Sequence, residues 1–236
     1  AAGHDPDRAA LAAACRRAEA AGLGVPCGPM DQVASALGVE AGAILLDCRS
    51  LDTRTVTLPQ GTALVVVDSG IRRTLAGSGY ADRVRECADA AARLGAESLR
   101  DITPADLRAV HAGLPDLLAR RVSHVVSENA RVLEAVACCE GGGSVADLGA
   151  IVDASHESLS LDFEVSLPDI DELVRTCRAV PGVRGARIVG AGFGGSVLAV
   201  VDAGEVDPAA TAAAIAAPAL VVHPSMGAHV LVPRPP

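Results

Sequence analysis

The feature that most limits the possible folds is the short apolar run Ala63–Val67, which is rich in valine. Turn-forming residues bound it on both sides, because Pro59–Gly61 precedes it and Asp68–Gly70 follows it. A continuous β-branched run of this length between two turns indicates a buried strand rather than a helix. Any fold of this chain therefore needs a sheet that buries this strand.

Helical periodicity dominates the chain after this run, and strand-like segments return only near its end. Apolar spacing and capping residues predict helices over Tyr80–Leu94, from Thr103–Pro104, over Pro115–Glu140, from Ser144 to about Ser155, over Ser166–Ala179 and over Asp207–Ala217. Short apolar runs predict strands over Arg187–Val189, Ser196–Val201, Ala219–His223 and Ala228–Val232. This order indicates an α+β fold with a mostly antiparallel sheet.

The first 60 residues show a separate pattern. Asp5–Asp7 suits a helix start, and Gly22 is expected to end that helix. A short helix to Leu37 follows, and then come two predicted strands, Ala43–Asp47 and Arg54–Leu58. The turn Pro59–Gly61 marks a boundary, so we predict one domain over residues 1–60 and another over residues 61–236.

Composition excludes two large classes of protein. The chain is 50% hydrophobic with a mean hydropathy of +0.35, but it has no Trp, one Tyr and two Phe. Its net charge is −9, and none of its 20 Lys and Arg residues is Lys. Because nucleic-acid binders need a basic face and stacking aromatics, no nucleic-acid partner is expected, although local amides and Arg can still bind ATP. No signal peptide or membrane-length apolar run is visible, which predicts no membrane partner and a cytoplasmic location.

The seven cysteines provide neither a disulfide framework nor a metal site. Their number is odd, no C-x-x-C pair occurs, and neither they nor the six histidines have the spacing of zinc ligands. Most lie in apolar helical patterns, where a buried free thiol is the usual state. We therefore expect a reducing cytosol and no metal ligands in this chain.

Asp31 is the single acid in the Gly/Pro-rich stretch Val25–Gln32, just before a short apolar run. A turn that places a carboxylate at the mouth of a helix is one way to hold a general base. Asp is also an ordinary residue in the first turn of a helix, where the helix dipole stabilises it. The residues of this stretch alone leave both interpretations open.

A glycine motif near the C-terminus superficially fits a dinucleotide-binding fingerprint. Gly190, Gly192 and Gly195 satisfy G-x-G-x-x-G, which requires a helix immediately afterwards. The following segment, Ser196–Val201, has the pattern of a strand, so the fingerprint fails its own test. A strand, a glycine turn and a second strand instead allow the backbone to press against a neighbouring loop.

Four segments, in order, resemble the motifs of galactokinases, which belong to the GHMP small-molecule kinase superfamily. They are Gly28–Gln32, which matches G-x-M-D-Q; Asp68–Arg73 with Ser78–Cys87; Ser155–Leu159 with Asp162–Ser166; and Gly190–Gly195. The resemblance covers most of residues 22 to 231. It implies a GHMP kinase fold, with a ferredoxin-like C-terminal α/β sandwich after the end of an N-terminal domain.

The resemblance also implies roles for particular residues. Asp31 would lie beside the anomeric hydroxyl of the sugar and accept its proton. Gly28 would allow close approach of the sugar or would be a plain turn glycine. Tyr80, the single tyrosine, would contact the sugar or would be a half-buried aromatic at a helix start. Four glycines would pack near the ATP phosphates and the sugar: Gly190, Gly192, Gly194 and Gly195.

The implied reaction is transfer of the ATP γ-phosphate to the anomeric hydroxyl of galactose, with Mg²⁺ present. Two further family motifs, G-E-H-x-D-Y-x-G-G and P-x-G-x-G-L-S-S-S-A, are absent and are expected before Ala1. The ligands of Mg²⁺ are expected with them. Without a phosphate-binding loop this chain alone is not expected to bind ATP productively, and a separate chain could supply the N-terminal half.

Two alternatives stay open. The chain could be a non-catalytic remnant that serves as a sugar-binding or interaction module, or a GHMP kinase for a related sugar. The presence of Asp31 and Tyr80 favours an enzyme over a remnant. His156 lies in Ser155–Ser158, but adjacency in sequence does not make a catalytic triad, and we expect structural hydrogen bonds at a helix end.

Overall fold

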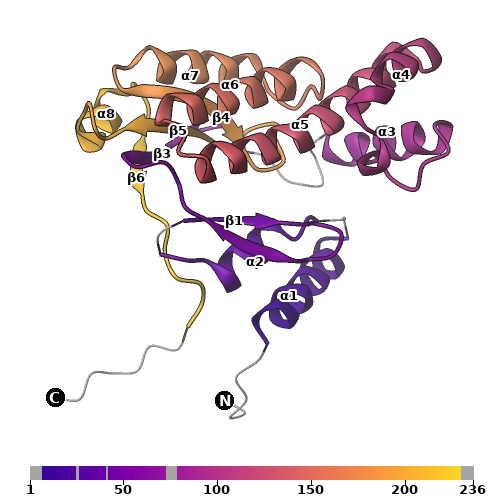
Figure 1. Cartoon of the computed structure of the whole chain (residues 1–236), viewed down its shortest axis with the longest axis horizontal. Coiled ribbons are helices and arrows are strands. Elements are labelled where there is room, and N and C mark those ends of the chain that lie inside the picture. Colours follow the sequence, from indigo (N-terminus) through magenta and orange to yellow (C-terminus); the bar gives the residue numbers. More distant parts are fainter. Residues whose placement is uncertain (1–6, 25–26, 41, 73–78, 230–236) are drawn as a thin grey trace. The chain divides into compact units, whose positions relative to one another are not determined.

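The computed structural model describes residues 7–24, 27–40, 42–72 and 79–229, and Figure 1 shows the arrangement of their elements. The chain divides into two compact units, residues 1–58 with 223–236, and residues 59–222. The first boundary lies next to the predicted turn. Residues 223–229 group with the first unit, whereas the sequence predicts them in the second domain.

Backbone hydrogen bonds explain why this C-terminal segment belongs to the first unit. The amide of Gly227 donates to the carbonyl of Gly38 at 2.8 Å, and the amide of Ala228 donates to the carbonyl of Ser35 at 2.7 Å. The final predicted strand is not found at Ala228 and His229, and residues 230–232 lie outside the described part of the chain.

The first unit has two helices and a two-stranded antiparallel sheet, α1 (Arg8–Leu23), α2 (Met30–Leu37), β1 (Ala43–Leu46) and β2 (Thr53–Val56). Both predicted strands are confirmed to within two residues. The first helix begins and ends later than predicted, because Asp7 caps it and the left-handed Gly24 (φ 67°), not Gly22, ends it. A small core of Ala12, Val33 and Ala36 joins the two helices.

The second unit is built on a four-stranded sheet in the order β4–β5–β3–β6, with every neighbouring pair antiparallel. Its strands are β3 (Thr62–Asp68), β4 (Val183–Val189), β5 (Ser196–Asp202) and β6 (Ala219–Val222). β3 has a partner on both sides, and Val65 and Val67 are fully buried. The predictions of a buried strand and of an α+β fold with an antiparallel sheet are confirmed.

The helices of the second unit are α3 (Tyr80–Arg93), α4 (Leu107–Gly113), α5 (Asp116–Glu140), α6 (Val145–Leu161), α7 (Pro168–Ala179) and α8 (Pro208–Ala214). Two single 3₁₀ turns, Leu99–Asp101 and Pro104–Asp106, precede α4, so the helix predicted from Thr103–Pro104 is split. Helix α8, which lies in the alanine-rich run, ends at Ala214, earlier than predicted. Across the described residues, no helix combines the length and apolar character that a membrane span requires.

Two apolar cores hold the second unit together. One lies between the sheet and helices α6, α7 and α8, and includes Val67, Ile170 and Val201. The other joins α3 and α4 to one end of the long helix α5, as Figure 1 shows. Helix α6 also protects the β4 edge, because Asp153 accepts a hydrogen bond from the amide of Ala186 at 2.7 Å.

Candidate functional site

Asp31 lies in the first turn of α2 in the first unit, with its side chain exposed. Two apolar residues of this short helix, Val33 and Ala36, are buried, which turns Asp31 outward. The neighbouring Gly28 is also exposed, and a Cβ added there would meet no atom within 4 Å. The structure thus presents Asp31 and Gly28 at the surface of their unit, where a ligand can reach them.

The glycine motif forms the connection between β4 and β5, as the strand pattern predicts. Its backbone is left-handed at five positions, a conformation that residues other than glycine rarely adopt. These positions are Gly190 (φ 83°), Gly192 (φ 80°), Phe193 (φ 60°), Gly194 (φ 135°) and Gly195 (φ 90°). We call residues 190–195 the glycine turn.

On one side the glycine turn is bonded to the loop that follows β3. The amide of Gly195 donates to the carbonyl of Ile71 at 3.1 Å. The carbonyl of Gly195 accepts from the Ser69 amide at 3.1 Å and from the Ser69 hydroxyl at 2.6 Å. A Cβ at Gly194 would lie 2.9 Å from the carbonyl oxygen of Ile71, so a larger residue does not fit. The turn therefore presses directly on a neighbouring loop.

On its other side the glycine turn meets Val165 and the start of α3. The amide of Phe193 donates to the Val165 carbonyl at 2.7 Å. The ring of Phe193 fills the space beside Gly79, where an added Cβ would lie 2.6 Å from the ring. Tyr80 is the first residue of α3 and is half-buried. Three of the four segments that resemble galactokinase motifs, the glycine turn among them, are thus in contact although they are far apart in the sequence.

The loop after β3 carries an exposed ion pair. Both terminal nitrogens of Arg72 donate to Asp68, at 2.8 and 2.7 Å, and the amide of Gly70 donates to it at 3.0 Å. The bonds from Arg72 and then from Gly70 hold the pKa of Asp68 well below its usual range. Arg72 therefore has a structural partner. Arg73 and Ser78 of the resembling segment lie outside the described residues.

The sequence did not indicate the buried ion pairs that join α3, α5 and the loop between α6 and α7. Arg121 in α5 is buried and bonds to Glu86 of α3 and Glu164 of the α6–α7 loop. The sequence signal is slight, since it is one arginine on the apolar face of a predicted helix.

Two histidines form polar contacts within the core of the second unit. The Nδ1 atom of His124 lies 3.0 Å from the Ser158 hydroxyl, which donates to Asp162 at 2.9 Å. In a catalytic triad the histidine lies between the serine and the acid, whereas here the serine lies between the other two. Because the Ser158 hydroxyl donates its proton to Asp162, it cannot donate that proton to His124 at the same time. These residues therefore do not form a catalytic triad. His156 accepts a bond from the Ile188 amide at 3.4 Å and pairs with Asp171. Its role is structural, although it lies within α6 rather than at its end.

The described residues contain no group of three or more His, Cys, Asp or Glu side chains that could hold a metal ion. All seven cysteines are free. The expectation that most are buried is wrong, because only Cys177 of the seven is buried, while Cys15 and Cys48 are exposed.

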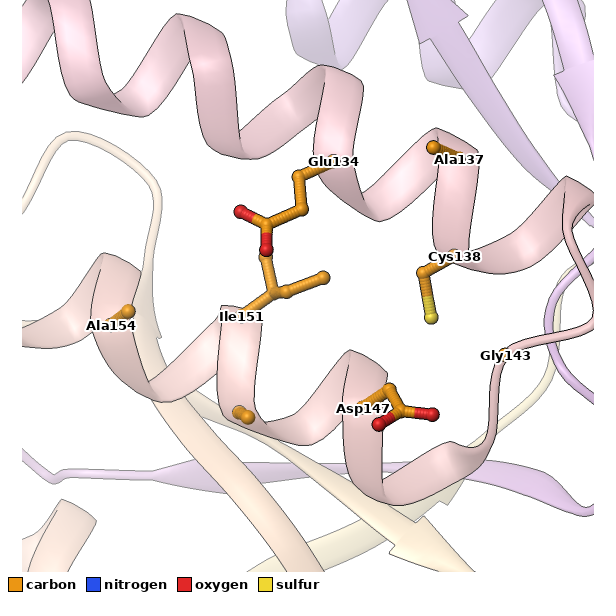
Figure 2. Close-up of a pocket in the computed structure, with 8 residues that line it drawn as sticks. Glu134, Ala137, Cys138, Gly143, Asp147, Ile151 and Ala154 are labelled. Carbon is orange, nitrogen blue, oxygen red and sulfur yellow. The ribbon is translucent and has the colours of Figure 1, made fainter.

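A separate hollow of about 500 Å³ lies between α5 and α6, and Figure 2 shows the side chains around it. None of the predicted site residues lines it. Burial, and then the nearby charges of Asp147 and Glu134, raise the pKa of the Cys138 thiol. A thiol with a raised pKa is mostly protonated at neutral pH, so Cys138 is a poor nucleophile.

Comparison with known proteins identifies related kinases. Residues 133–219 match the family model described as GHMP kinases C terminal. A curated galactokinase from Roseiflexus sp. (strain RS-1) is 44% identical over 203 residues, which are 84% of this chain and 51% of that protein. The chain therefore spans about half the length of this relative.

Solved structures show the same relationship. The galactokinase of Lactococcus lactis, crystallised with galactose, has a TM-score of 0.84 at 29% identity, with 95% of this chain and 61% of that chain covered. The mevalonate kinase of L. major, in complex with R-mevalonate, has a TM-score of 0.53 at 21% identity, with 84% and 53% covered, and shows a shared fold alone. The chain belongs to the galactokinases of the GHMP kinase superfamily and matches their C-terminal portion.

Proposed function

We propose that this chain supplies the sugar-side residues of a galactokinase, which transfers the γ-phosphate of ATP to the anomeric hydroxyl of galactose. The observation that carries the proposal is the meeting of Ser69–Ile71, Gly79 and Val165 at the glycine turn. These contacts lie in three of the four segments that resemble galactokinase motifs. The identity of 44% to a curated galactokinase supports the same assignment.

In this proposal Asp31 acts on the acceptor. As the anomeric oxygen forms a bond to the γ-phosphorus, the bond from that phosphorus to the bridging oxygen of ADP breaks, and Asp31 takes the hydroxyl proton. The exposed position of Asp31 at the start of α2 supports this role, because the carboxylate can meet a substrate. Tyr80 contributes its hydroxyl to the sugar, and the glycine turn shapes the surface beside it.

ATP is the co-substrate, and Mg²⁺ would neutralise phosphate charge in the transition state. The described residues offer no cluster of carboxylates, histidines or cysteines that fits a metal ion. The roles assigned here therefore concern the sugar and its proton, and none of them depends on a metal ligand in this chain.

The test is an Asp31→Asn substitution in the complete product of the gene that encodes this chain. We expect kcat with galactose to fall by about 10²- to 10⁴-fold, the range that positioned acid–base groups supply. The control is Glu40→Gln, another exposed acid of the same unit, which should leave kcat unchanged. A fall of less than about tenfold would show that Asp31 is not the base.

Kinetic and binding measurements on the wild-type protein separate the two alternatives, a kinase for a related sugar and a non-catalytic remnant. Wild-type turnover of N-acetylgalactosamine, arabinose or a uronic acid at a higher kcat/KM than galactose would replace galactose as the substrate. Galactose binding by calorimetry without any turnover would instead favour a non-catalytic remnant that recognises sugar.

A further inference from the structure

Arg121, near the start of α5, has 0% solvent exposure, and no other Asp, Glu, Lys or Arg within the described ranges is buried. Removing a guanidinium from water is strongly unfavourable unless its donors are satisfied. A buried ion pair is also weak evidence for stability, because well-packed apolar residues of similar volume often stabilise as much. A buried arginine at this position therefore suggests a geometric role.

The three nitrogens of this guanidinium bond to three different acceptors. Nε donates to Glu86 in α3 at 2.7 Å, one terminal nitrogen donates to the Asp162 carbonyl, and the other donates to Glu164. One rigid planar group thus joins α5 to α3 and to the loop between α6 and α7. A lysine could replace the charge but not the fixed angles between donors.

Glu164 is held in a backbone conformation that a non-glycine residue avoids. Its φ is 53°, in the left-handed region, which is unfavourable for an L-residue. Arg120 donates to Oε1 of its carboxylate at 2.8 Å, and Arg121 donates to Oε2. Strained backbone of this kind persists where its surroundings over-determine it. Here three arginines do so, because Arg83 of α3 also pairs with Glu164, with its terminal nitrogen 3.7 Å from Oε2.

The loop that contains Glu164 bears directly on the glycine turn. Val165, the next residue, accepts the bond from the Phe193 amide. A Cβ at Gly192 would lie 2.5 Å from the Val165 Cβ, so the two backbones are closely packed. The Phe193 ring in turn packs against Gly79, immediately before Tyr80. The contacts close a circuit, because α3, which starts at Tyr80, returns to Arg121 through Glu86.

We infer that Arg121 is a positioning residue that fixes the distance between Tyr80 at the start of α3 and the glycine turn. The positioning role of Arg121 does not depend on the proposed function, but its expected effect on sugar binding does. If Tyr80 contacts galactose, a loosened α3 weakens sugar binding and leaves the chemical step in place.

The first test measures exchange of individual amide protons by NMR in the complete protein. In Arg121→Met, the amides of Phe193 and Arg83 should exchange about tenfold faster or more, while those of β3 keep their wild-type rates. These two amides bond to Val165 and Gly79, on the two sides of the circuit. Arg121→Lys should restore protection only in part.

The matched control is Arg93→Met. Arg93 also pairs with an acid, Asp89 at 2.9 Å, but on the exposed surface of α3 and apart from the circuit. Its exchange rates should equal those of the wild type. Equal rates in Arg121→Met and wild type would overturn the inference.

The second test uses the steady-state kinetics of the same variants. In Arg121→Met the KM for galactose should rise by about tenfold, with kcat within about threefold of the wild-type value. A purely structural defect would lower the active fraction, so that kcat falls and KM stays constant, and this result would contradict the inference. If the wild type has no turnover with galactose, the proposed function fails, while amide exchange still decides the role of Arg121.

A milder variant covers the case in which Arg121→Met does not fold. Glu164→Gln removes one charged acceptor of the circuit, and its side chain is 42% exposed, so the fold should tolerate the change. Faster exchange of the Phe193 amide is expected again, by a smaller factor. Unchanged exchange in this folded variant would overturn the inference.

Discussion

At the scale of single residues, Gly28 is a useful position to test, because neither packing nor backbone conformation requires a glycine there. Its added Cβ would meet nothing within 4 Å, and its φ is not in the left-handed region. We expect Gly28→Ala to change the free energy of unfolding by less than about 0.5 kcal/mol. If the sugar approaches this backbone closely, the KM for galactose should rise by about tenfold.

Urea unfolding and steady-state kinetics measure the two effects of Gly28→Ala separately. Gly22→Ala is the control, since a Cβ there also meets nothing within 4 Å. It should leave KM unchanged, and because Gly22 lies in the last turn of α1 it should be neutral or raise the free energy of unfolding by up to about 1 kcal/mol. An unaltered KM in Gly28→Ala would identify Gly28 as a plain turn glycine.

Single residues were also the hardest part of the site to predict. The sequence placed Asp31 at a helix start and the four glycines in a turn between strands, because local spacing determines both. It could not identify Arg121 or Glu164, because their partners lie 35 and 43 residues away from Arg121 in the chain. Only the folded structure brings such partners together.

At the scale of elements, α6 and β4 touch backbone to backbone. A Cβ at Gly149 of α6 would overlap the carbonyl of Arg184, and a Cβ at Gly185 would overlap the carbonyl of Gly149. Gly149→Ala should therefore lower the free energy of unfolding by about 2 kcal/mol or more, because overpacking outweighs the gain in helix propensity. Urea denaturation followed by circular dichroism measures the change.

Gly113→Ala provides the comparison for that prediction. Gly113 is also helical, but a Cβ there meets no atom within 4 Å. The substitution should be neutral or should stabilise by up to about 1 kcal/mol. Equal effects at Gly113 and Gly149 would mean that α6 and β4 are not in this close contact.

The elements themselves were largely predictable where periodicity or capping was strong. The helix from Ser144 was expected from its cap, and the structure shows Ser144 and Asp147 in a capping box. The start of β4 was missed, since the strand begins at Val183 rather than Arg187. Gly185 and an irregular register beside it interrupt the apolar pattern that signals a strand.

At the scale of the whole molecule, stability should depend on pH through buried histidine. His124 stacks on Phe163 at 4.3 Å, and burial lowers the pKa of His124 from 6.5 to about 4. Below pH 6.5 the unfolded chain binds a proton that the folded state does not bind until about pH 4. The free energy of unfolding should therefore fall as the pH drops through this window, by about 3 kcal/mol at most.

Urea midpoints at about pH 7 and about pH 5 test this dependence. His124→Gln should remove most of it, whereas His111→Gln, at an exposed position, should leave it unchanged. Burial also lowers the pKa of His156, which adds a smaller loss in the same direction. A pH slope that persists in His124→Gln would contradict the assignment to His124.

The grouping of distant segments was beyond sequence reasoning at this scale. The boundary near Pro59 was predictable from its turn residues, but the return of residues 223–229 to the first unit was not. That return depends on backbone bonds at Gly227 and Ala228, which carry no sequence signature of their own.

The position of β3 in the middle of its sheet has a consequence for how the protein is made. β3 leaves the ribosome well before its partner β5, since Ser69 and Gly195, which bond beside the two strands, are 126 residues apart. At roughly 5–20 residues per second, the valine-rich strand waits about ten seconds for a partner. Helices α3, α4 and α5 can assemble on local contacts during that interval. A nascent chain with an unpaired apolar strand is prone to aggregate, so we expect its yield in cells to depend on chaperones that bind such segments during translation.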